Sequence, residues 1–408
     1  MASSPTLLQN RNFRRLLAAD AISHAGTQIT SVALPLTAVV ALQAGALDTG
    51  LLNAAQQAAF LLLGLPAGVW VDRLRRRPIL VTTDLARAAL LLTLPVAWWL
   101  DLLTLPHLYV VAFGLSAATV FFDVAYRSYL PTLLDKDQLV RGNGAIESVA
   151  GLSRVAGPGV GGWAVQLVGG PVALLADAFS YLASALCLRG IDAHEALEDR
   201  PAERRALSGE IWEGVTFVLR DPALRAIATS AAVSNFCGAA IAVLQVLFLI
   251  RTVGISPGLY GMLLMAGAAG GLVAAVTSGR LAGRIGQARL IWLAPTVCTP
   301  FALLIPFTGA GWELSWFVVA TLMTATGGVL FNVAQASYRQ AISPDHLLGR
   351  VTASTRFIAW GVLPFGATAG GLLGELYSTR DGLWVVALAQ LLSLAPLLLS
   401  PLRRMRNF

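Results

Sequence analysis

Residues 68–80 read Gly-Val-Trp-Val-Asp-Arg-Leu-Arg-Arg-Arg-Pro-Ile-Leu and connect two apolar stretches, residues 50–71 and 79–100. Each stretch has about the 20 residues that a helix needs to cross the hydrocarbon core of a bilayer. The connection is short and holds four arginines within five positions. Basic residues gather in this way in cytoplasmic loops of membrane proteins. The stretch therefore predicts two membrane helices joined on the cytoplasmic side.

The same alternation continues along the whole chain. Only 12% of the 408 residues are charged and 56% are hydrophobic, whereas soluble domains have about 25% and 45–50%. We therefore predict an all-helical integral membrane protein with no large soluble domain. The expected spans are residues 16–41, 50–71, 79–100, 107–126, 144–168, 171–189, 224–249, 257–278, 288–308, 314–336, 351–374 and 383–401.

The basic residues predict the orientation. With the N-terminus in the cytoplasm, 24 of the 29 Lys and Arg residues fall in cytoplasmic segments. Arg87, Arg154 and Arg356 lie within the spans, and only Arg251 and Arg380 fall on the outer side. Both termini are therefore expected in the cytoplasm. The net charge of +7 then reflects topology and contact with membrane lipid headgroups, and no nucleic-acid partner is expected. A single Lys beside 28 Arg, with abundant Ala and Leu, suggests a GC-rich bacterial genome, and hence the bacterial plasma (inner) membrane.

The chain divides at a charged central connection. We expect an N-terminal six-helix bundle (1–190), a cytoplasmic linker (191–222) and a C-terminal six-helix bundle (223–408). Residues 207–219 suit a short helix on the membrane surface, with a plain linker as the alternative. The halves repeat at an offset of 209 residues, because Phe122-Asp-Val-Ala recurs as Phe331-Asn-Val-Ala and Gly161-Gly162 as Gly370-Gly371. Parallel repeats place a substrate site between the halves near the bilayer midplane.

The loop at residues 68–80 resembles the signature loop of the major facilitator superfamily, and residues 279–286 resemble a degenerate copy. The resemblance implies the fold of that family, twelve transmembrane helices in two pseudo-symmetric bundles. Gly68 is expected to let two helices approach closely, and Asp72 to pair with an Arg or a helix N-terminus. A cytoplasmic gate is expected where Arg73, Arg76 or Arg77 reaches Asp123. The alternative is a basic loop that only sets topology.

The span 144–168 contains Gly157-Pro158-Gly-Val-Gly161-Gly162. This resembles the motif of exporting antiporters in the superfamily, and its glycines are expected to contact the span 257–278. Residues 10–16, 122–127 and 137–143 resemble the efflux branch that contains enterobactin-exporter-like and macrolide-efflux-like proteins. The resemblance implies proton-coupled multidrug efflux of amphipathic small molecules, such as macrolides or siderophores.

Ionisable residues inside the spans are functional candidates because a charge at membrane depth is costly. In the first span Asp20, His24, Gln28 and Ser31 share one face, and we expect Asp20 and His24 to carry the coupling proton, with Glu147 as a third candidate. The alternative is that Asp20 pairs with Arg14 or Arg15 near the headgroups.

Glu147 and Arg154 lie seven residues apart, a separation that only long side chains bridge. We expect Arg154 to meet a carboxylate or a substrate acceptor. Glu147 is expected to pair with Arg356, which stands at the 209 offset. Asp84 and Arg87 are expected to form a local pair, and Asp177 is a weaker candidate.

Amide and aromatic side chains with a few charges are expected to line the substrate cavity. The candidates are Gln28, Asn53, Gln57, Arg154, Asn235, Gln245, Asn332 and Trp360. An importer or a lipid transporter on the same fold is the alternative, and a membrane sensor or enzyme is the second one. The sequence contains neither an evident metal-ligand cluster nor an evident nucleotide-binding loop. We therefore expect no metal or other cofactor and an ion gradient as the energy source. We also expect the protein to be a monomer.

Overall fold

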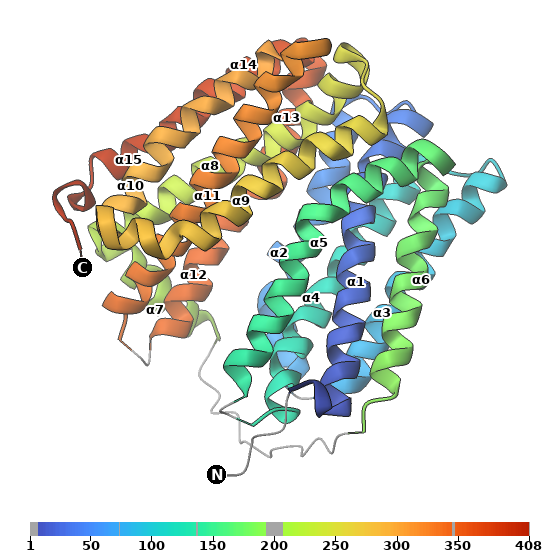
Figure 1. The fold of residues 1–408 in the computed structure, drawn as a ribbon, viewed down its shortest axis with the longest axis horizontal. Helices are drawn as coiled ribbons and strands as arrows, with labels where there is room; N and C mark the ends of the chain where they lie inside the picture. Colours follow the sequence, from blue (N-terminus) through green and yellow to red (C-terminus); the bar gives the residue numbers. More distant parts are fainter. Residues whose placement is uncertain (1–6, 73, 136–137, 193–206, 345–346, 408) are drawn as a thin grey trace. The chain divides into compact units, whose positions relative to one another are not determined.

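The computed structural model describes residues 7–72, 74–135, 138–192, 207–344 and 347–407. Every regular element within these ranges is a helix (Figure 1). The chain forms two units, one of residues 1–44, 55–200 and 256–265 and the other of residues 45–54, 201–255 and 266–408. The main division at residue 200 falls inside the expected linker. Residues 45–54 and 256–265 are exceptions, because each of these segments belongs to the unit formed mainly by the other half of the chain.

The first six predicted spans each form one helix. Their bounds are α1 (Arg11–Leu36), α2 (Ala46–Asp72), α3 (Arg76–Trp99), α4 (Leu105–Tyr129), α5 (Leu139–Val168) and α6 (Gly170–Arg189). The second half adds α7 (Leu207–Arg220), α8 (Pro222–Leu247), α9 (Pro257–Ile285), α10 (Gln287–Cys298), α11 (Leu314–Ile342), α12 (Leu348–Trp360), α13 (Leu363–Leu376), α14 (Thr379–Gln390) and α15 (Leu394–Leu398). Each of the twelve predicted spans contains one or more helices.

Prolines divide the late spans into pieces. Pro364 has no N–H to bond the carbonyl of Trp360, and α12 ends at Trp360 while α13 begins at Leu363. In the span 288–308 a 3-10 helix, Thr299–Phe307, continues α10. The last span is α14, a 3-10 turn at Leu391–Ser393 and α15. The sequence predicts where these spans lie but not that they are broken.

The first unit is built around α1. This helix packs against α5 and α6, while α3 packs against α4 and α6. Asn10 begins α1, because its side-chain oxygen accepts from the amides of Asn12 and Phe13 at 3.0 and 3.1 Å, as an N-cap residue does. Phe13, Leu16 and Tyr129 are fully buried in the apolar core at this end.

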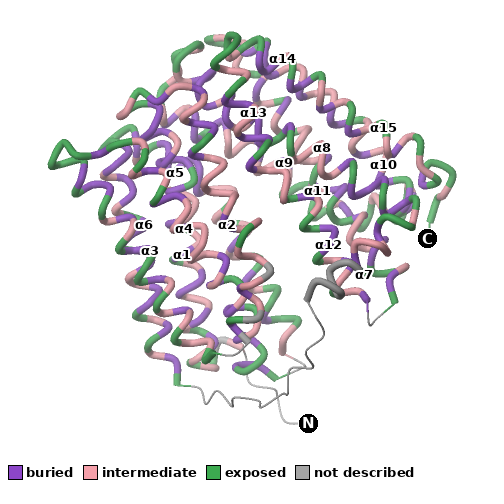
Figure 2. The backbone as a smooth tube through the Cα atoms, turned by 180° about the vertical axis from the view of Figure 1, so that it is seen from behind, coloured by how far each residue is buried: buried purple, intermediate pink, exposed green. Residues whose placement is uncertain are grey.

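The second unit is built around α8, which packs against α12, α13 and α14, while α10 packs against α11. Figure 2 shows buried residues alternating with intermediate and exposed ones along these helices. The expected short helix is present as α7, and it packs on α12. Glu213 of α7 accepts a hydrogen bond from Arg350 at 2.6 Å, so this helix is fixed to the protein by a charged contact.

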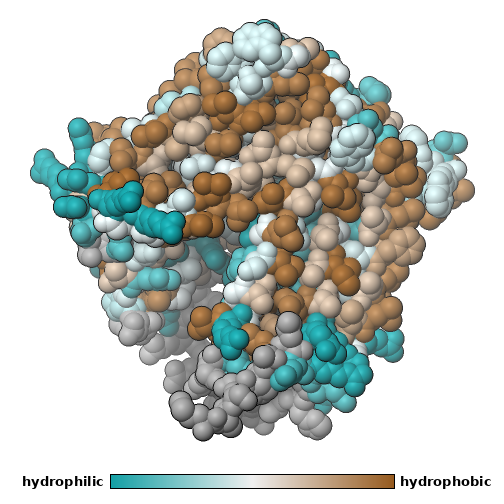
Figure 3. Space-filling view, in the orientation of Figure 1, coloured by the Kyte–Doolittle hydropathy of each residue, from teal (hydrophilic) through white to brown (hydrophobic). Residues whose placement is uncertain are grey.

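The surface has the character that a membrane requires. Among the described residues nine helices are long and apolar enough to span a bilayer. The helices α1 and α5 are more polar, because they carry Asp20, Glu147 and Arg154. Large apolar side chains are exposed on α5 and α6, such as Leu167 and Leu186. Figure 3 shows hydrophobic side chains over this face of the first unit and hydrophilic ones at its lower end, where α1 begins.

Candidate functional site

Asp20 is a residue of α1, and its side chain is buried inside the first unit. Its side chain is only 4% exposed, and Oδ1 lies 3.5 Å from His24 Nε2. The other oxygen, Oδ2, is buried, and Tyr126 of α4 also interacts with this carboxyl. The His24 side chain is 41% exposed, so the pair connects a buried carboxylate to an exposed imidazole. The described residues show no ion pair between Asp20 and Arg14 or Arg15, and the depth of Asp20 relative to the headgroups stays a prediction.

The other two residues of the predicted polar face of α1, Gln28 and Ser31, make local contacts. Gln28 is half-buried and lies against Gly157, where an added Cβ would collide with its side chain. Ser31 is exposed and donates to the carbonyl oxygen of Gln28 at 2.7 Å. Gln28 therefore lies in a helix crossing, and its role as a cavity residue stays a prediction.

The glycine motif of α5 contacts two helices. An added Cβ at Gly161 would lie 3.1 Å from Ile29 Cα of α1, and one at Gly162 would lie 2.9 Å from Gly261 Cα of α9. Residues 256–265 of α9 belong to the same unit as α5. The expected contact between the motif and the span 257–278 is thus present, with Pro158 buried inside α5.

An analogous contact lies in the second unit. A Cβ at Gly371 of α13 would lie 2.8 Å from the carbonyl oxygen of Ala46 and 3.1 Å from Gly50 Cα, both in the first turns of α2. Gly371 stands 209 residues after Gly162, so the internal repeat extends to the helix contacts.

Glu147 and Arg154 form a pair within α5. Arg154 Nη2 lies 3.3 Å from Glu147 Oε2, and both side chains are more than half exposed. The contact that only a long side chain could make within the helix is therefore present, and a contact of Arg154 with a substrate stays a prediction. The guanidinium of Arg356 lies over the ring of Trp360, 5.7 Å from its centroid. The bridge from Glu147 to Arg356 stays a prediction.

The basic loop differs from expectation at two points. A Cβ added at Gly68 would meet no atom within 4 Å, so the close helix approach expected there is not found among the described residues. Arg77 donates to the carbonyl oxygens of Leu188 and Arg189 at the end of α6. Arg73 and the side chain of Asp72 lie outside the described residues. Asp123 is exposed on α4, and its approach by Arg73 or Arg76 stays a prediction.

The second unit brings two cavity candidates to the break between α12 and α13. Asn235 of α8 donates to the carbonyl oxygen of Ala359 at 2.7 Å, and Trp360 is 44% exposed. Interrupted helices with free carbonyls form binding sites in transporters. The other amides are dispersed: Asn53 and Gln57 are half-buried on α2, Gln245 is half-buried on α8, and Asn332 is exposed on α11.

Sequence reasoning underestimated a buried polar cluster in the first unit. Asp84 and Asp177 are fully buried and Arg87 is 3% exposed. The local pair between Asp84 and Arg87 is present as predicted. What the sequence did not reveal is that Asp177 lies nearby, hydrogen-bonded by hydroxyls of Thr30 and Ser180. Ser and Thr recurring along α1 were the available signal.

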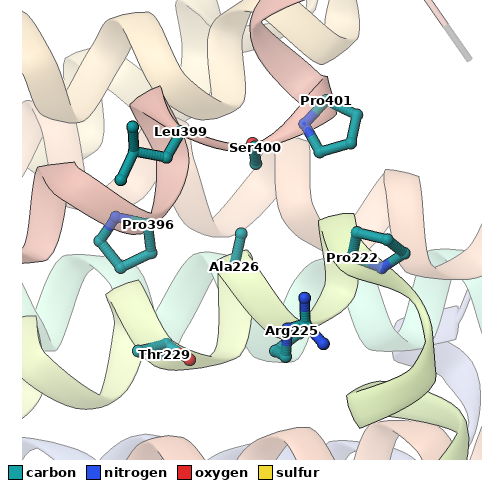
Figure 4. A pocket seen from close by; sticks show the side chains of 8 residues that line it. All are labelled: Pro222, Arg225, Ala226, Thr229, Pro396, Leu399, Ser400 and Pro401. Carbon is teal, nitrogen blue, oxygen red and sulfur yellow. The ribbon is translucent and has the colours of Figure 1, made fainter.

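A surface pocket lies apart from all these residues (Figure 4). It measures about 280 Å³ and is enclosed by the start of α8 and by the segment after α14. Its lining residues are Pro222, Arg225, Ala226, Thr229, Pro396, Leu399, Ser400 and Pro401. The described residues contain no group of His, Cys, Asp and Glu that could hold a metal ion.

Comparisons with known proteins agree on one family. The model of the Major Facilitator Superfamily matches residues 16–368. The multidrug efflux pump Tap of Mycolicibacterium fortuitum is 29% identical over 395 residues, covering 92% of both chains. Tap of Mycobacterium tuberculosis (strain ATCC 25618 / H37Rv) is 26% identical over 374 residues, covering 88% of this chain and 86% of its own.

Solved structures share the fold. The nucleoside transporter NupG superposes with a TM-score of 0.76 at 11% identity, covering 95% of this chain and 98% of its own. A bacterial homologue of the iron transporter ferroportin, in an inward-facing state, gives a TM-score of 0.74 at 17% identity with the same coverages. These low identities support the architecture and not a shared substrate.

Proposed function

The chain belongs to the major facilitator superfamily and is therefore a multi-pass membrane transporter, and from this premise we propose that it exports amphipathic drugs or natural products in exchange for protons. The proposed location is the bacterial plasma membrane, with both termini in the cytoplasm. Proton entry from outside would drive each substrate molecule outward. The family accounts for the transport activity, while direction and coupling rest on residues of this chain.

The observation that carries the proposal is the Asp20–His24 pair. Asp20 is 3% exposed, one of its oxygens lies 3.5 Å from an imidazole, and no arginine neutralises it within the described residues. A buried carboxylate beside a histidine can take up or release a proton without breaking a strong ion pair. Such a group at membrane depth is a suitable carrier for a coupling proton.

Two findings support export. The glycine motif of α5 is packed against both α1 and α9, which is the contact that the exporting members would use to seal one side of the pathway. The Tap proteins, which are similar along nearly the whole chain, are named as multidrug efflux pumps. A macrolide and a lipophilic cation are therefore the first substrates to test.

Transport in inverted membrane vesicles tests both parts of the proposal. We expect an imposed proton gradient to drive accumulation of the substrate inside inverted vesicles, and a protonophore to abolish it. Asp20→Asn is expected to remove the dependence on the gradient, because the amide cannot carry a proton. Accumulation in right-side-out vesicles instead would identify an importer.

Asp101→Asn is the matched control. Asp101 is an exposed carboxylate of the same unit, and its backbone has a φ of 56°, a conformation that Asn adopts as readily as Asp. This variant should keep gradient-driven transport. If Asp20→Asn also keeps it, Asp20 is not the coupling site.

A further inference from the structure

A buried polar cluster connects three helices of the first unit. Its charged members are Asp84 and Arg87 of α3 and Asp177 of α6, and their exposed fractions are 0%, 3% and 0%. Thr30 of α1 and Ser180 of α6 complete it. The cluster contains two acids and one base, so its charges do not balance when both acids are ionised.

Arg87 is committed to Asp84 and to two aromatic rings. Its Nη2 donates to Asp84 Oδ1, and its guanidinium carbon lies 4.3 Å from the ring centroids of Phe122 and of Tyr181. Cations are attracted to the faces of such rings. The contacts from both sides fix the guanidinium beside Asp84, which leaves Asp177 without an ion pair among the described residues.

Among the described residues, the carboxyl of Asp177 is hydrogen-bonded by hydroxyl groups. Thr30 donates to Oδ2 at 2.5 Å and Ser180 donates to Oδ1 at 2.8 Å. A hydroxyl can donate or accept by rotating its hydrogen. The same heavy-atom arrangement therefore satisfies Asp177 in its ionised and in its protonated state, which an arginine partner would not permit.

Gly26 makes room for this arrangement. A Cβ at position 26 would collide with Ser180 Oγ and with Asp177 Oδ1. The carboxyl thus lies directly against the backbone of α1, in a space that only glycine leaves open. This fit places the group at a defined position between α1 and α6.

Arg87 and Asp84 are the charged side chains that interact electrostatically with the carboxyl of Asp177. Tyr181 of α6 is bonded to Thr27 of α1 at 2.9 Å between hydroxyl oxygens. On α5, the other helix packed against α6, Glu147 and Arg154 pair with each other on the exposed side. The short segment Thr37–Ala41 that also contacts α6 carries no charge.

A row of hydroxyls on α1 leads from Asp177 toward Asp20. Thr30, Thr27 and Ser23 follow at spacings of three and four residues, and Asp20 comes three residues earlier. Residues at these spacings lie on one side of a helix. At 1.5 Å per residue, Thr30 and Asp20 are separated by about 15 Å along the axis.

From the charge count and the hydroxyl shell we infer that Asp177 is a second proton-binding site, distinct from Asp20. One proton on Asp177 balances the cluster, because burial of an uncompensated carboxylate is costly and a second acid near a shared cation favours the neutral form. The inference deepens the proposed proton coupling and rests on it for its role in transport. Binding of the proton itself does not depend on the proposed function.

Infrared difference spectroscopy tests the site directly. The full-length protein in detergent is titrated without substrate, and the C=O stretch of protonated carboxyl groups is recorded. We expect Asp177→Asn to remove one protonated-carboxyl band. Asp84→Asn should also remove it, because the cluster then contains one acid and one base and its charges balance without the proton. A carboxyl region that is unchanged in both variants overturns the inference.

Thr30→Val covers the case in which a charge variant fails to fold. Loss of this hydroxyl is expected to shift the frequency of the Asp177 band. Thr119→Val is the control and should leave the band unchanged, because the Thr119 hydroxyl donates to the carbonyl oxygen of Leu115 at 2.8 Å. Absence of a shift in Thr30→Val contradicts the assignment.

The vesicle experiment separates this inference from the proposed function. A band that depends on Asp177 in a protein whose transport ignores the proton gradient supports the site and refutes the coupling. Gradient-driven transport without such a band refutes only the site.

Discussion

Replacing Gly162 by alanine is expected to impair transport through a backbone collision. The new Cβ would lie 2.9 Å from Gly261 Cα and 2.5 Å from the carbonyl oxygen of Pro257. Both are backbone atoms of α9, so no change of side-chain rotamer relieves the contact. The two helices must separate by several tenths of an ångström before the methyl group fits.

The size of the effect follows from packing energetics. Inserting a methyl group into a tightly packed contact costs about 1–3 kcal/mol. The cost applies only to conformations in which α5 and α9 touch at this point. We take transport to alternate between conformations with and without this contact. The substitution then shifts the equilibrium between them about 5- to 150-fold against the conformations in which α5 and α9 touch. A transporter biased this strongly toward one conformation should turn over more slowly.

Initial transport rates in vesicles, with the apparent Tm in detergent, measure this prediction. Gly151→Ala is the control in the same helix, because a Cβ there meets nothing within 4 Å. Gly371→Ala tests the equivalent contact of α13 and should behave like Gly162→Ala. Wild-type rates in Gly162→Ala, together with an unchanged Tm, would refute the view that this contact forms and breaks during transport.

Two further predictions concern charged side chains. The 3.3 Å contact suggests that Glu147 acts through Arg154. Exchanging the two charges (Glu147→Arg with Arg154→Glu) is then expected to restore transport that a single charge reversal abolishes. Restoration by Glu147→Arg with Arg356→Glu would identify the bridge from Glu147 to Arg356 instead. Arg87→Lys is expected to lower the apparent Tm, because lysine loses the planar stacking between two rings, worth about 0.5–2 kcal/mol for each cation–π contact; an unchanged Tm would show that the rings contribute nothing.

The spans were predictable because the bilayer imposes a length and a composition on every helix that crosses it. Even the polar helices α1 and α5 follow this pattern, since their charges are few and isolated within apolar sequence. The interruption at Trp360 could have been anticipated from Pro364, since a proline removes the bond to the fourth preceding carbonyl. Whether a helix then kinks or breaks depends on neighbouring elements, here Asn235, which bonds the carbonyl of Ala359.

The partners of individual polar residues were less predictable. A Thr in a helix usually bonds the carbonyl four residues earlier, as Thr27 does with Ser23 at 2.8 Å. Nothing in the sequence distinguishes it from Thr30, whose hydroxyl reaches Asp177, 147 positions away. Glycines present the same difficulty, because Gly68 and Gly162 look alike in sequence, yet only Gly162 lies in a close helix contact.

The two acidic sites along α1 are expected to respond to a proton in different ways. At Asp177 hydroxyl rotation alone accommodates the change, and α1 is held there by the fit of Gly26 against α6. On the opposite side of α1, Ile29 is held against Gly161, so the helix cannot rotate without breaking one of these contacts.

Asp20 has different neighbours. They are the buried Tyr126 of α4, which interacts with the carboxyl, and His24, whose side chain is 41% exposed. A proton on Asp20 therefore changes the charge beside an exposed imidazole, whereas a proton on Asp177 is accommodated by rotation of the hydroxyls that bind it. From this difference we expect Asp20 to be the site where protonation and substrate binding compete, and Asp177 to be a site where protonation leaves the helix packing unchanged.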